Sequence, residues 1–543
     1  MRSERFVIRN TADMRCLPIL SIDRNDESAG GKREGTLADS LKNKVAKGAV
    51  WAALEKFSVQ AMHFVVGMVL ARLLTPTDYG TVALLSIFFA VAGSLASCGF
   101  GNALVQRKNV GDLEFNSVFY TSIAASLIIY VALFFAAPWI AAFYKVPVLR
   151  PLARVAAISF ILNAINSVQG AELSRKMLFD KRFRISLIVS IVSAISGITL
   201  AYLGFGVWAL VYASLLSNLA SVIAYWTIIA WRPRFMFSFS AVKGMFSYGW
   251  KLSLSSMINA VYNEIYGFFI GRVYSPSDLA FVNKSRAMPK LLMTSVDGTI
   301  SSVSFPALSQ IQNEKEKFRN AMRRMIQCST FLVFPLLTVL AMTARPLTLL
   351  LYGSQWEPAV IYVPIGCFVM ATTPICSINC LAVSALGKSG IYLVLEIVKK
   401  GTGFILMILS IRHGIMFFVL TMAFVQGPFG LLVNTFVNGK LLSCGFRTQM
   451  RDIAPSVGLC TVSAVAMWGV GRLLSPVYTM ISYQNLAYAV ELLIECGIGF
   501  GLYFTLAYAF RLRPMAEYCN IMLPVMRKRL PKLAKRIAAV KWE

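Results

Sequence analysis

Charged residues, histidine and catalytic motifs are all scarce in this sequence. Aspartate, glutamate, lysine and arginine make up 14% of the 543 residues, whereas a soluble protein carries about a quarter. Two histidines are too few for a histidine-rich metal site, and the ten scattered cysteines do not form a disulfide framework. No P-loop, paired-carboxylate loop or nucleophile elbow is found. We therefore expect no enzyme, no catalytic residue, no metal and no cofactor.

Long apolar runs are what the sequence has instead. Hydrophobic residues account for 57% of the chain, and they fall in uninterrupted runs of roughly 20, the length that crosses a bilayer core. This pattern predicts an all-α integral membrane protein with about 14 transmembrane helices. We place the spans near residues 48–71, 80–101, 117–140, 152–173, 185–204, 206–230, 245–271, 280–305, 325–350, 358–386, 391–411, 414–438, 453–474 and 486–510.

The loop charges predict the orientation. The net charge is +28, and lysine and arginine mark the cytoplasmic side of membrane proteins. One side carries 107–108, 175–184, 232–243, 315–324, 440–451 and the basic tail 511–543, while the opposite side carries few basic residues. Both termini are therefore expected in the cytoplasm. Basic residues spread over short loops beside spans fit anionic lipid headgroups better than nucleic acid.

The first 42 residues are expected to form a disordered cytoplasmic leader. Their one apolar stretch, Cys16–Ile22, is too short for the core of a cleavable signal peptide.

Two stretches at an offset of 200 residues are nearly the same: ARLLTPTDYG (71–80) and GRVYSPSDLA (271–280). Each combines a Thr or Ser N-cap, a proline at the first helical position and an aspartate three residues after the cap, which predicts a capping box. The matched residues are Arg72, Pro76 and Asp78 in the first copy, and Arg272, Pro276 and Asp278 in the second. We interpret them as an internal duplication, in which one helix ends and the next begins.

The duplication predicts two lobes of about six helices each, in the same orientation because an even number of spans returns the chain to its starting side. Repeated bundles that face each other across a cavity are typical of alternating-access transporters. The expected units are the leader 1–42, an N-lobe 43–240, a C-lobe 241–442, two additional helices in 443–510 and the tail 511–543.

Polar residues inside the predicted spans are candidate functional residues, because they are costly in lipid. Lys56, Gln60, His63 and Gly67 follow helical spacing on one face of the first span, and the seventh span carries a corresponding stripe around Asn259. The candidate substrate-binding residues are Lys56, Gln60, His63, Asn263, Lys284, Arg286 and Lys290, and the candidate ion-coupling residues are Glu55, Glu264 and Asp297. Cationic groups in a cavity favour an anionic substrate such as a phosphate or diphosphate headgroup.

Each polar residue also has a structural interpretation. Lys56 and Lys251 can extend their ammonium groups from an interface to water. Glu55 and Lys56 can compensate each other's charge, and His63 can bond a neighbouring helix.

Five stretches resemble the Wzx/TuaB-type polysaccharide flippases of the multidrug/oligosaccharidyl-lipid/polysaccharide exporter superfamily. They are VLARLLTPTDYG (69–80), LSRKMLFDKRF (173–183), WRPRF (231–235), FPALSQIQNEKEKFRNAMRR (305–324) and LLYGSQWEPAV (350–360). The resemblance implies a two-lobed fold similar to the MATE transporters in a bacterial cytoplasmic membrane. It further implies a polyprenyl-diphosphate-linked oligosaccharide as cargo, H⁺ or Na⁺ as coupling ion, and polymerase and chain-length proteins as partners.

Two other functions stay open at this point. A MATE-like antiporter of cationic drugs would need an acidic cavity, whereas the charges inside these spans lean basic. A polysaccharide polymerase or ligase would need reactive groups on a long outward loop, and the outward loops here are short.

Overall fold

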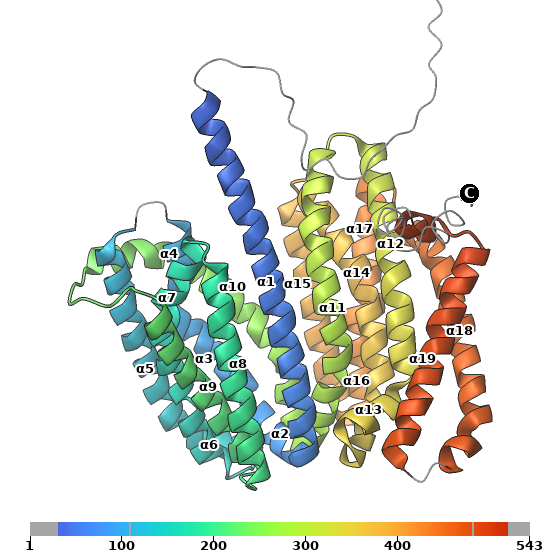
Figure 1. Ribbon diagram of the computed structural model, residues 1–543, viewed down its shortest axis with the longest axis horizontal. Helices are drawn as coiled ribbons and strands as arrows, with labels where there is room; N and C mark the ends of the chain where they lie inside the picture. Colours follow the sequence, from blue (N-terminus) through green and yellow to red (C-terminus); the bar gives the residue numbers. More distant parts are fainter. Residues whose placement is uncertain (1–30, 108–109, 481–482, 520–543) are drawn as a thin grey trace, which may run out of the picture.

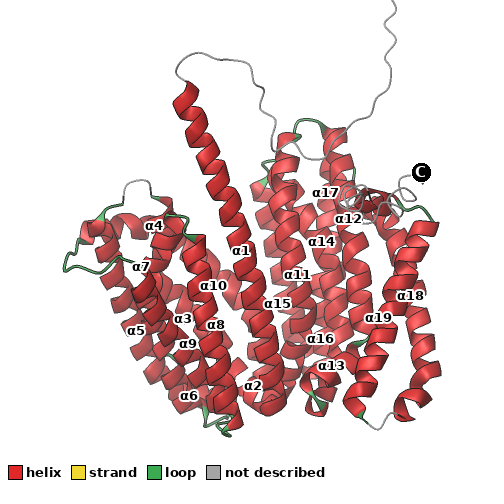
Figure 2. Cartoon of the chain, viewed as in Figure 1, coloured by secondary structure: helices red, strands yellow, loops and turns green. Residues whose placement is uncertain are grey.

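The computed structural model describes residues 31–107, 110–480 and 483–519. Figure 2 shows helices joined by short loops, and no strand occurs within these ranges, which confirms the all-α prediction. The first nine helices are α1 (Gly31–Leu73), α2 (Pro76–Ala83), α3 (Ser86–Ser97), α4 (Phe100–Gln106), α5 (Asp112–Tyr144), α6 (Leu149–Ala156), α7 (Ile158–Arg175), α8 (Phe179–Tyr202) and α9 (Val207–Ile228).

Ten further helices follow. They are α10 (Phe239–Val273), α11 (Pro276–Gln310), α12 (Lys315–Met342), α13 (Ala344–Tyr352), α14 (Tyr362–Ala385), α15 (Ser389–Ser410), α16 (Ile415–Phe424), α17 (Gly430–Leu442), α18 (Phe446–Met480) and α19 (Gln484–Ala509). A 3₁₀ segment, Ser354–Ala359, follows α13, and a π-helical segment, Val425–Phe429, joins α16 to α17.

Eleven helical segments of the described chain are long and apolar enough to cross a membrane. The protein is therefore an integral membrane protein that crosses the bilayer many times. Three other long helices, α10, α11 and α15, fall short because polar and charged residues interrupt their apolar sequence. They coincide with the seventh, eighth and eleventh predicted spans, so the count of about 14 stays a prediction.

The duplicated stretch starts α2 and α11 in the predicted way. Thr75 Oγ1 accepts a hydrogen bond from the Asp78 backbone N–H (3.2 Å), and the Asp78 carboxylate accepts one from the Thr75 backbone N–H (3.0 Å). Ser275 and Asp278 repeat this exchange at 3.1 Å in both directions. Both capping boxes are confirmed.

The two helix starts also meet in space, at the lower end of the molecule as drawn in Figure 1. Gly80 of α2 lies so close to α11 that a Cβ there would be 1.7 Å from the Pro276 carbonyl oxygen. Only a residue without a side chain permits this approach. The duplicated stretches therefore close the lower end, the one that carries α2, α6 and α13. We call the opposite end, where α4 and the start of α12 lie, the upper end.

Helices α3–α9 gather on one side of the molecule and α11–α19 on the other, with α1 between them (Figure 1). α1 packs against α8, on the side of the first half. α10, which the sequence assigns to the C-lobe, packs along α3, α4 and α5 and also contacts α11. The lobe boundaries therefore stay a prediction, with α10 as the helix that joins the halves.

The structure corrects the expected leader at its end. α1 begins at Gly31, so residues 31–42 are helical rather than disordered. These residues include no proline and several good helix formers, which explains the earlier start. Residues 1–30 lie outside the described chain, as do residues 520–543 of the tail.

Candidate functional site

A cavity of about 700 Å³ lies between α1 and α11. Its lining includes three lysines and one histidine, and no acidic residue is among the described side chains that form it. The lining residues are Lys56, Gln60, His63, Phe64, Gly67, Lys284, Ala287, Met288, Lys290, Leu291, Thr294, Gly298 and Tyr352. We call this space the basic cavity.

α1 supplies the polar stripe that helical spacing predicts. Lys56, Gln60, His63 and Gly67 all line the basic cavity, because intervals of three and four residues return to one face of a helix. Lys56 reaches across to α11, where its ammonium donates to the Thr294 carbonyl oxygen at 3.4 Å. Lys56 and His63 are exposed, so the ammonium group and the imidazole ring are accessible to a ligand in the cavity.

α11 supplies Lys284 and Lys290 from the opposite wall. Lys290 is exposed, whereas Lys284 sits at the lower limit of the cavity among aromatic rings. The Lys284 ammonium lies 4.5 Å from the ring centre of Tyr352, 4.7 Å from that of Tyr79 and 5.5 Å from that of Trp356. It also donates to the Gly67 carbonyl oxygen of α1 at 3.1 Å. Cation–π attraction and this hydrogen bond hold Lys284 as a tie between α1 and α11.

Below Lys284 the last turn of α1 is fastened to the segment after α13. The Trp356 indole N–H donates to the Ala71 carbonyl at 2.8 Å, and the Gln355 amide donates to the carbonyls of Ala71 (2.6 Å) and Leu74 (3.2 Å). The Arg72 guanidinium donates in turn to backbone carbonyls at the end of α13. Carbonyls in the last turn of a helix lack intrahelical partners, and here the contact satisfies them. We call these contacts of Arg72, Gln355 and Trp356 the latch.

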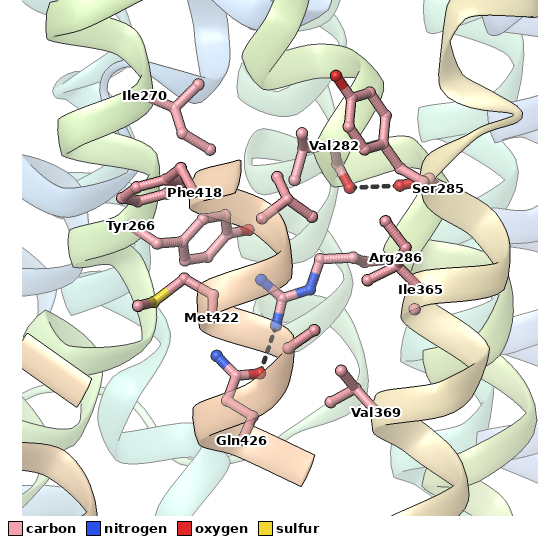
Figure 3. A pocket seen from close by; sticks show the side chains of 14 residues that line it. Tyr266, Ile270, Val282, Ser285, Arg286, Ile365, Val369, Phe418, Met422 and Gln426 are labelled. Carbon is pink, nitrogen blue, oxygen red and sulfur yellow. Dashed lines mark hydrogen bonds between the residues drawn. The ribbon is translucent and has the colours of Figure 1, made fainter. Parts of the chain in front are cut away.

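Arg286 does not face the basic cavity. It lies two residues after Lys284, about 200° further around the helix, and points into a separate pocket among α10, α11, α14 and α16 (Figure 3). There its guanidinium donates to the Gln426 side-chain oxygen at 2.9 Å and lies 4.7 Å from the ring centre of Tyr266. Gln426 belongs to the π-helical segment, a feature frequent at functional sites. The expected grouping of Arg286 with Lys56 is therefore wrong.

The remaining candidates are also placed apart from the basic cavity. Glu55 faces α8, where it accepts hydrogen bonds from Arg182 (3.2 Å) and Ser186 (2.8 Å). Asn263 is exposed on α10 and is not among the lining residues. Glu264, half-buried on α10, is also not among the lining residues.

For Asp297, the side chain lies outside the described part of α11.

The polar stripe of α10 contacts α15 rather than the basic cavity. Lys400 of α15 donates to the Asn259 side-chain oxygen at 2.6 Å and also pairs with Glu396 at 3.5 Å. Lys399 pairs with the same carboxylate. In this structure Asn259 meets α15, and no residue of the α10 stripe is among those that line the basic cavity, so the shared cavity expected for the two stripes stays a prediction.

Sequence reasoning missed the aromatic surroundings of Lys284 and the latch. Tyr352, Gln355 and Trp356 lie within LLYGSQWEPAV, a stretch selected above for family resemblance alone. Trp356 is fully buried, and an indole N–H in such a place needs an acceptor. That rule calls for a partner but does not identify Ala71, which lies 285 positions away.

Comparison with known proteins gives the family. The family described as "Polysaccharide biosynthesis protein" matches residues 69–361, more than half of the chain. This range contains both copies of the duplicated stretch and the latch.

Three curated relatives match a similar part of the chain. The succinoglycan biosynthesis transport protein ExoT of Rhizobium meliloti is 26% identical over 58% of this chain and 64% of its own length. The teichuronic acid biosynthesis protein TuaB of Bacillus subtilis is 22% identical over 59% and 67%, and the lipopolysaccharide biosynthesis protein WzxC of Escherichia coli is 22% identical over 61% and 68%. The chain thus spans about two thirds of the length of these relatives.

Two solved structures share the fold. The lipid II flippase MurJ in an inward closed conformation aligns with a TM-score of 0.63, at 14% identity, over 84% of this chain and 98% of that chain. A MATE family multidrug resistance transporter in an inward-facing conformation aligns with a TM-score of 0.55, at 17% identity, over 74% and 98%.

Proposed function

Since this chain belongs to the polysaccharide biosynthesis protein family of Wzx-type flippases, we propose that it flips a polyprenyl-diphosphate-linked oligosaccharide across a bacterial cytoplasmic membrane. The observation that carries the proposal is the basic cavity, whose lining includes three lysines and no described carboxylate. A diphosphate needs such cationic donors, and flexible lysines suit a ligand that must also leave.

The proposed cycle alternates access between the two ends. The upper end, with basic residues at 107, 175–184 and 315–324, is placed in the cytoplasm because of its charge. Counting α10, α11 and α15 as spans gives the fourteen helices and the two lobes that the duplication suggests. In the conformation described, Gly80 and the latch hold the lower, outward end shut.

Within this cycle, Lys56 and Lys290 are the first contacts of the diphosphate, because both are exposed in the cavity. Lys284 lies deeper and already binds the Gly67 carbonyl. A diphosphate that reaches Lys284 would compete with this carbonyl and loosen the tie between α1 and α11. The polyprenyl tail stays in the bilayer, and H⁺ or Na⁺ supplies the driving force.

An antiporter of cationic drugs is less well supported. A cationic cargo calls for carboxylates, and no described side chain that lines the basic cavity is acidic.

The test is a double variant, Lys56→Gln with Lys290→Gln, in a strain that lacks the chromosomal copy. Hydrogen bonds to charged groups are worth about 1.5–3 kcal/mol each, so we expect at least a tenfold loss of surface polysaccharide at an unchanged membrane level of the protein. Lipid-linked sugar should accumulate in the inner leaflet, measured by a leaflet-resolved assay.

Lys251→Gln is the matched control, because Lys251 is exposed on α10 and does not line the cavity. Wild-type export by the double variant would contradict the proposed diphosphate site.

A further inference from the structure

Glu495 of α19 is a buried carboxylate for which the described part of the chain supplies no hydrogen bond or ion pair. It is 7% exposed, and its Oε2 has no hydrogen-bond partner in the described chain. Its Oε1 faces Gly471 of α18 so closely that a Cβ on this glycine would lie 2.7 Å away. An ionised carboxylate in such a place is costly unless a cation or several donors surround it, whereas the protonated form costs much less.

The titratable groups nearest to Glu495 on its own helix do not compensate its charge. Glu491 lies one turn toward the lower end and is half-buried, so it adds negative charge rather than removing it. Cys496, the next residue, is half-buried and carries no charge in its thiol form.

The helices that pack against α19 also supply no described cation that pairs with the Glu495 carboxylate. Arg345 of α13 pairs with Glu357 at 3.1 Å, and both are exposed at the lower end. Arg472 of α18 places its guanidinium 5.6 Å from the ring centre of Trp468. Neither arginine forms an ion pair with Glu495, and no other described cation does.

Access to Glu495 differs between the two sides. Toward the upper end, Gly499 lies against Met467 and Val339, where a Cβ would be 2.6 and 2.7 Å from their side chains. One turn further Tyr503 is fully buried, and residues 331–342 of α12, which pass this region, contain no charged residue. Toward the lower end, the half-buried Glu491 and the exposed Arg345 lead to the surface.

We propose that Glu495 is a proton-binding site that exchanges its proton with the lower, outward face through Glu491. The reaction is the protonation of one carboxylate by one proton taken from water. The role of this proton in transport rests on the proposed function, and it selects H⁺ from the two coupling ions named there. Glu55, one of the candidates chosen from sequence, already accepts hydrogen bonds from Arg182 and Ser186.

Proton binding at Glu495 can affect the contacts of the latch through α13, which lies between them. α19 packs against α13, and the carbonyls at the end of α13 accept hydrogen bonds from Arg72. A neutral Glu495 is compatible with this packing, whereas a charged one calls for water or a cation between the helices. Protonation therefore favours the closed lower end, and loss of the proton favours its opening.

The first experiment follows the carboxyl group directly, without any substrate. Infrared difference spectra of the purified full-length protein in lipid nanodiscs, recorded across a pH titration, should contain the C=O band of a protonated buried carboxyl, shifted in deuterated water. Glu495→Gln should lose this band.

Glu172→Gln is the matched control. Glu172 is also buried, at 9% exposed, but it has a cation beside it, the Lys176 ammonium at 2.5 Å. This variant should therefore keep the band. The band persisting unchanged in Glu495→Gln would overturn the proposal. If that variant fails to fold, Glu491→Gln tests the same claim: the pH midpoint of the band should move, and an unchanged midpoint overturns it.

The second experiment tests coupling. Export in cells should become independent of the transmembrane pH gradient in Glu495→Gln and stay dependent on it in Glu172→Gln. A lost band with unchanged, gradient-dependent export would refute the coupling and leave the flippase function untouched. Loss of export in Lys56→Gln/Lys290→Gln with the band intact would support both proposals separately.

Discussion

Replacing Trp356 by phenylalanine should weaken the closure of the lower end. Trp356 is fully buried, and its indole N–H donates to the Ala71 carbonyl at 2.8 Å. Its ring meets Tyr79 edge-on at 5.5 Å and Phe281 at 6.0 Å. Phenylalanine keeps an aromatic ring in this place and removes the donor and part of the buried area.

The magnitude follows from these contacts. Gln355 also donates to the Ala71 carbonyl, at 2.6 Å, so this carbonyl keeps a partner in the variant. The loss of the Trp356 hydrogen bond therefore destabilises the closed end by about 1 kcal/mol, without the added penalty of an unsatisfied acceptor. The smaller ring removes roughly another 1 kcal/mol of apolar burial. If Trp356 makes these contacts only when the lower end is closed, the ratio of open to closed molecules rises about 5- to 30-fold.

The assay is double electron–electron resonance between spin labels at Arg150→Cys and Arg412→Cys, in a background without other reactive cysteines. Both positions are exposed at the lower end, Arg150 in the first turn of α6 and Arg412 in the short segment after α15. Trp356→Phe should add a population at longer distance. Trp468→Phe, on the exposed Trp468 of α18, should not.

An unchanged distance distribution in Trp356→Phe, together with a lowered melting temperature, would contradict a role of Trp356 in closing the lower end. Trp356 would then stabilise the fold in both conformations and take no part in gating.

Two further predictions concern close contacts between helices. Gly80→Ala should force the lower end apart and lengthen the same spin-label distance, because its Cβ would lie 1.7 Å from the Pro276 carbonyl oxygen. Gly458→Ala, in open space on α18, is the control and should leave this distance unchanged. Equal behaviour of the two variants would contradict the close approach. Asp452→Asn should lower the thermal midpoint in detergent, because Asp452 accepts two hydrogen bonds of 2.7 Å from Arg323, a loss of about 1.5–3 kcal/mol. An unchanged midpoint would show that this ion pair between α12 and α18 contributes nothing.

Local helix starts and insertion into a membrane can both be predicted from the sequence alone. The starts of α2 and α11 follow from a cap, a proline and an aspartate within four residues, so no distant contact is needed to predict them. Apolar runs of membrane length likewise predict insertion wherever the helices finally lie. The polar face of α1 is equally local, because helical spacing alone puts Lys56, Gln60 and His63 together.

Which helix faces contact each other depends on tertiary packing. Helical spacing cannot say whether Arg286 turns toward α1 or toward Gln426, or that α10 offers Asn259 to α15, because these choices depend on how whole helices pack. The surroundings of Glu495 belong to the same class. A glutamate in an apolar run is visible in the sequence, but the lack of a cation beside it among the described side chains depends on three neighbouring helices. Local rules fix what a segment is, and only packing fixes what it touches.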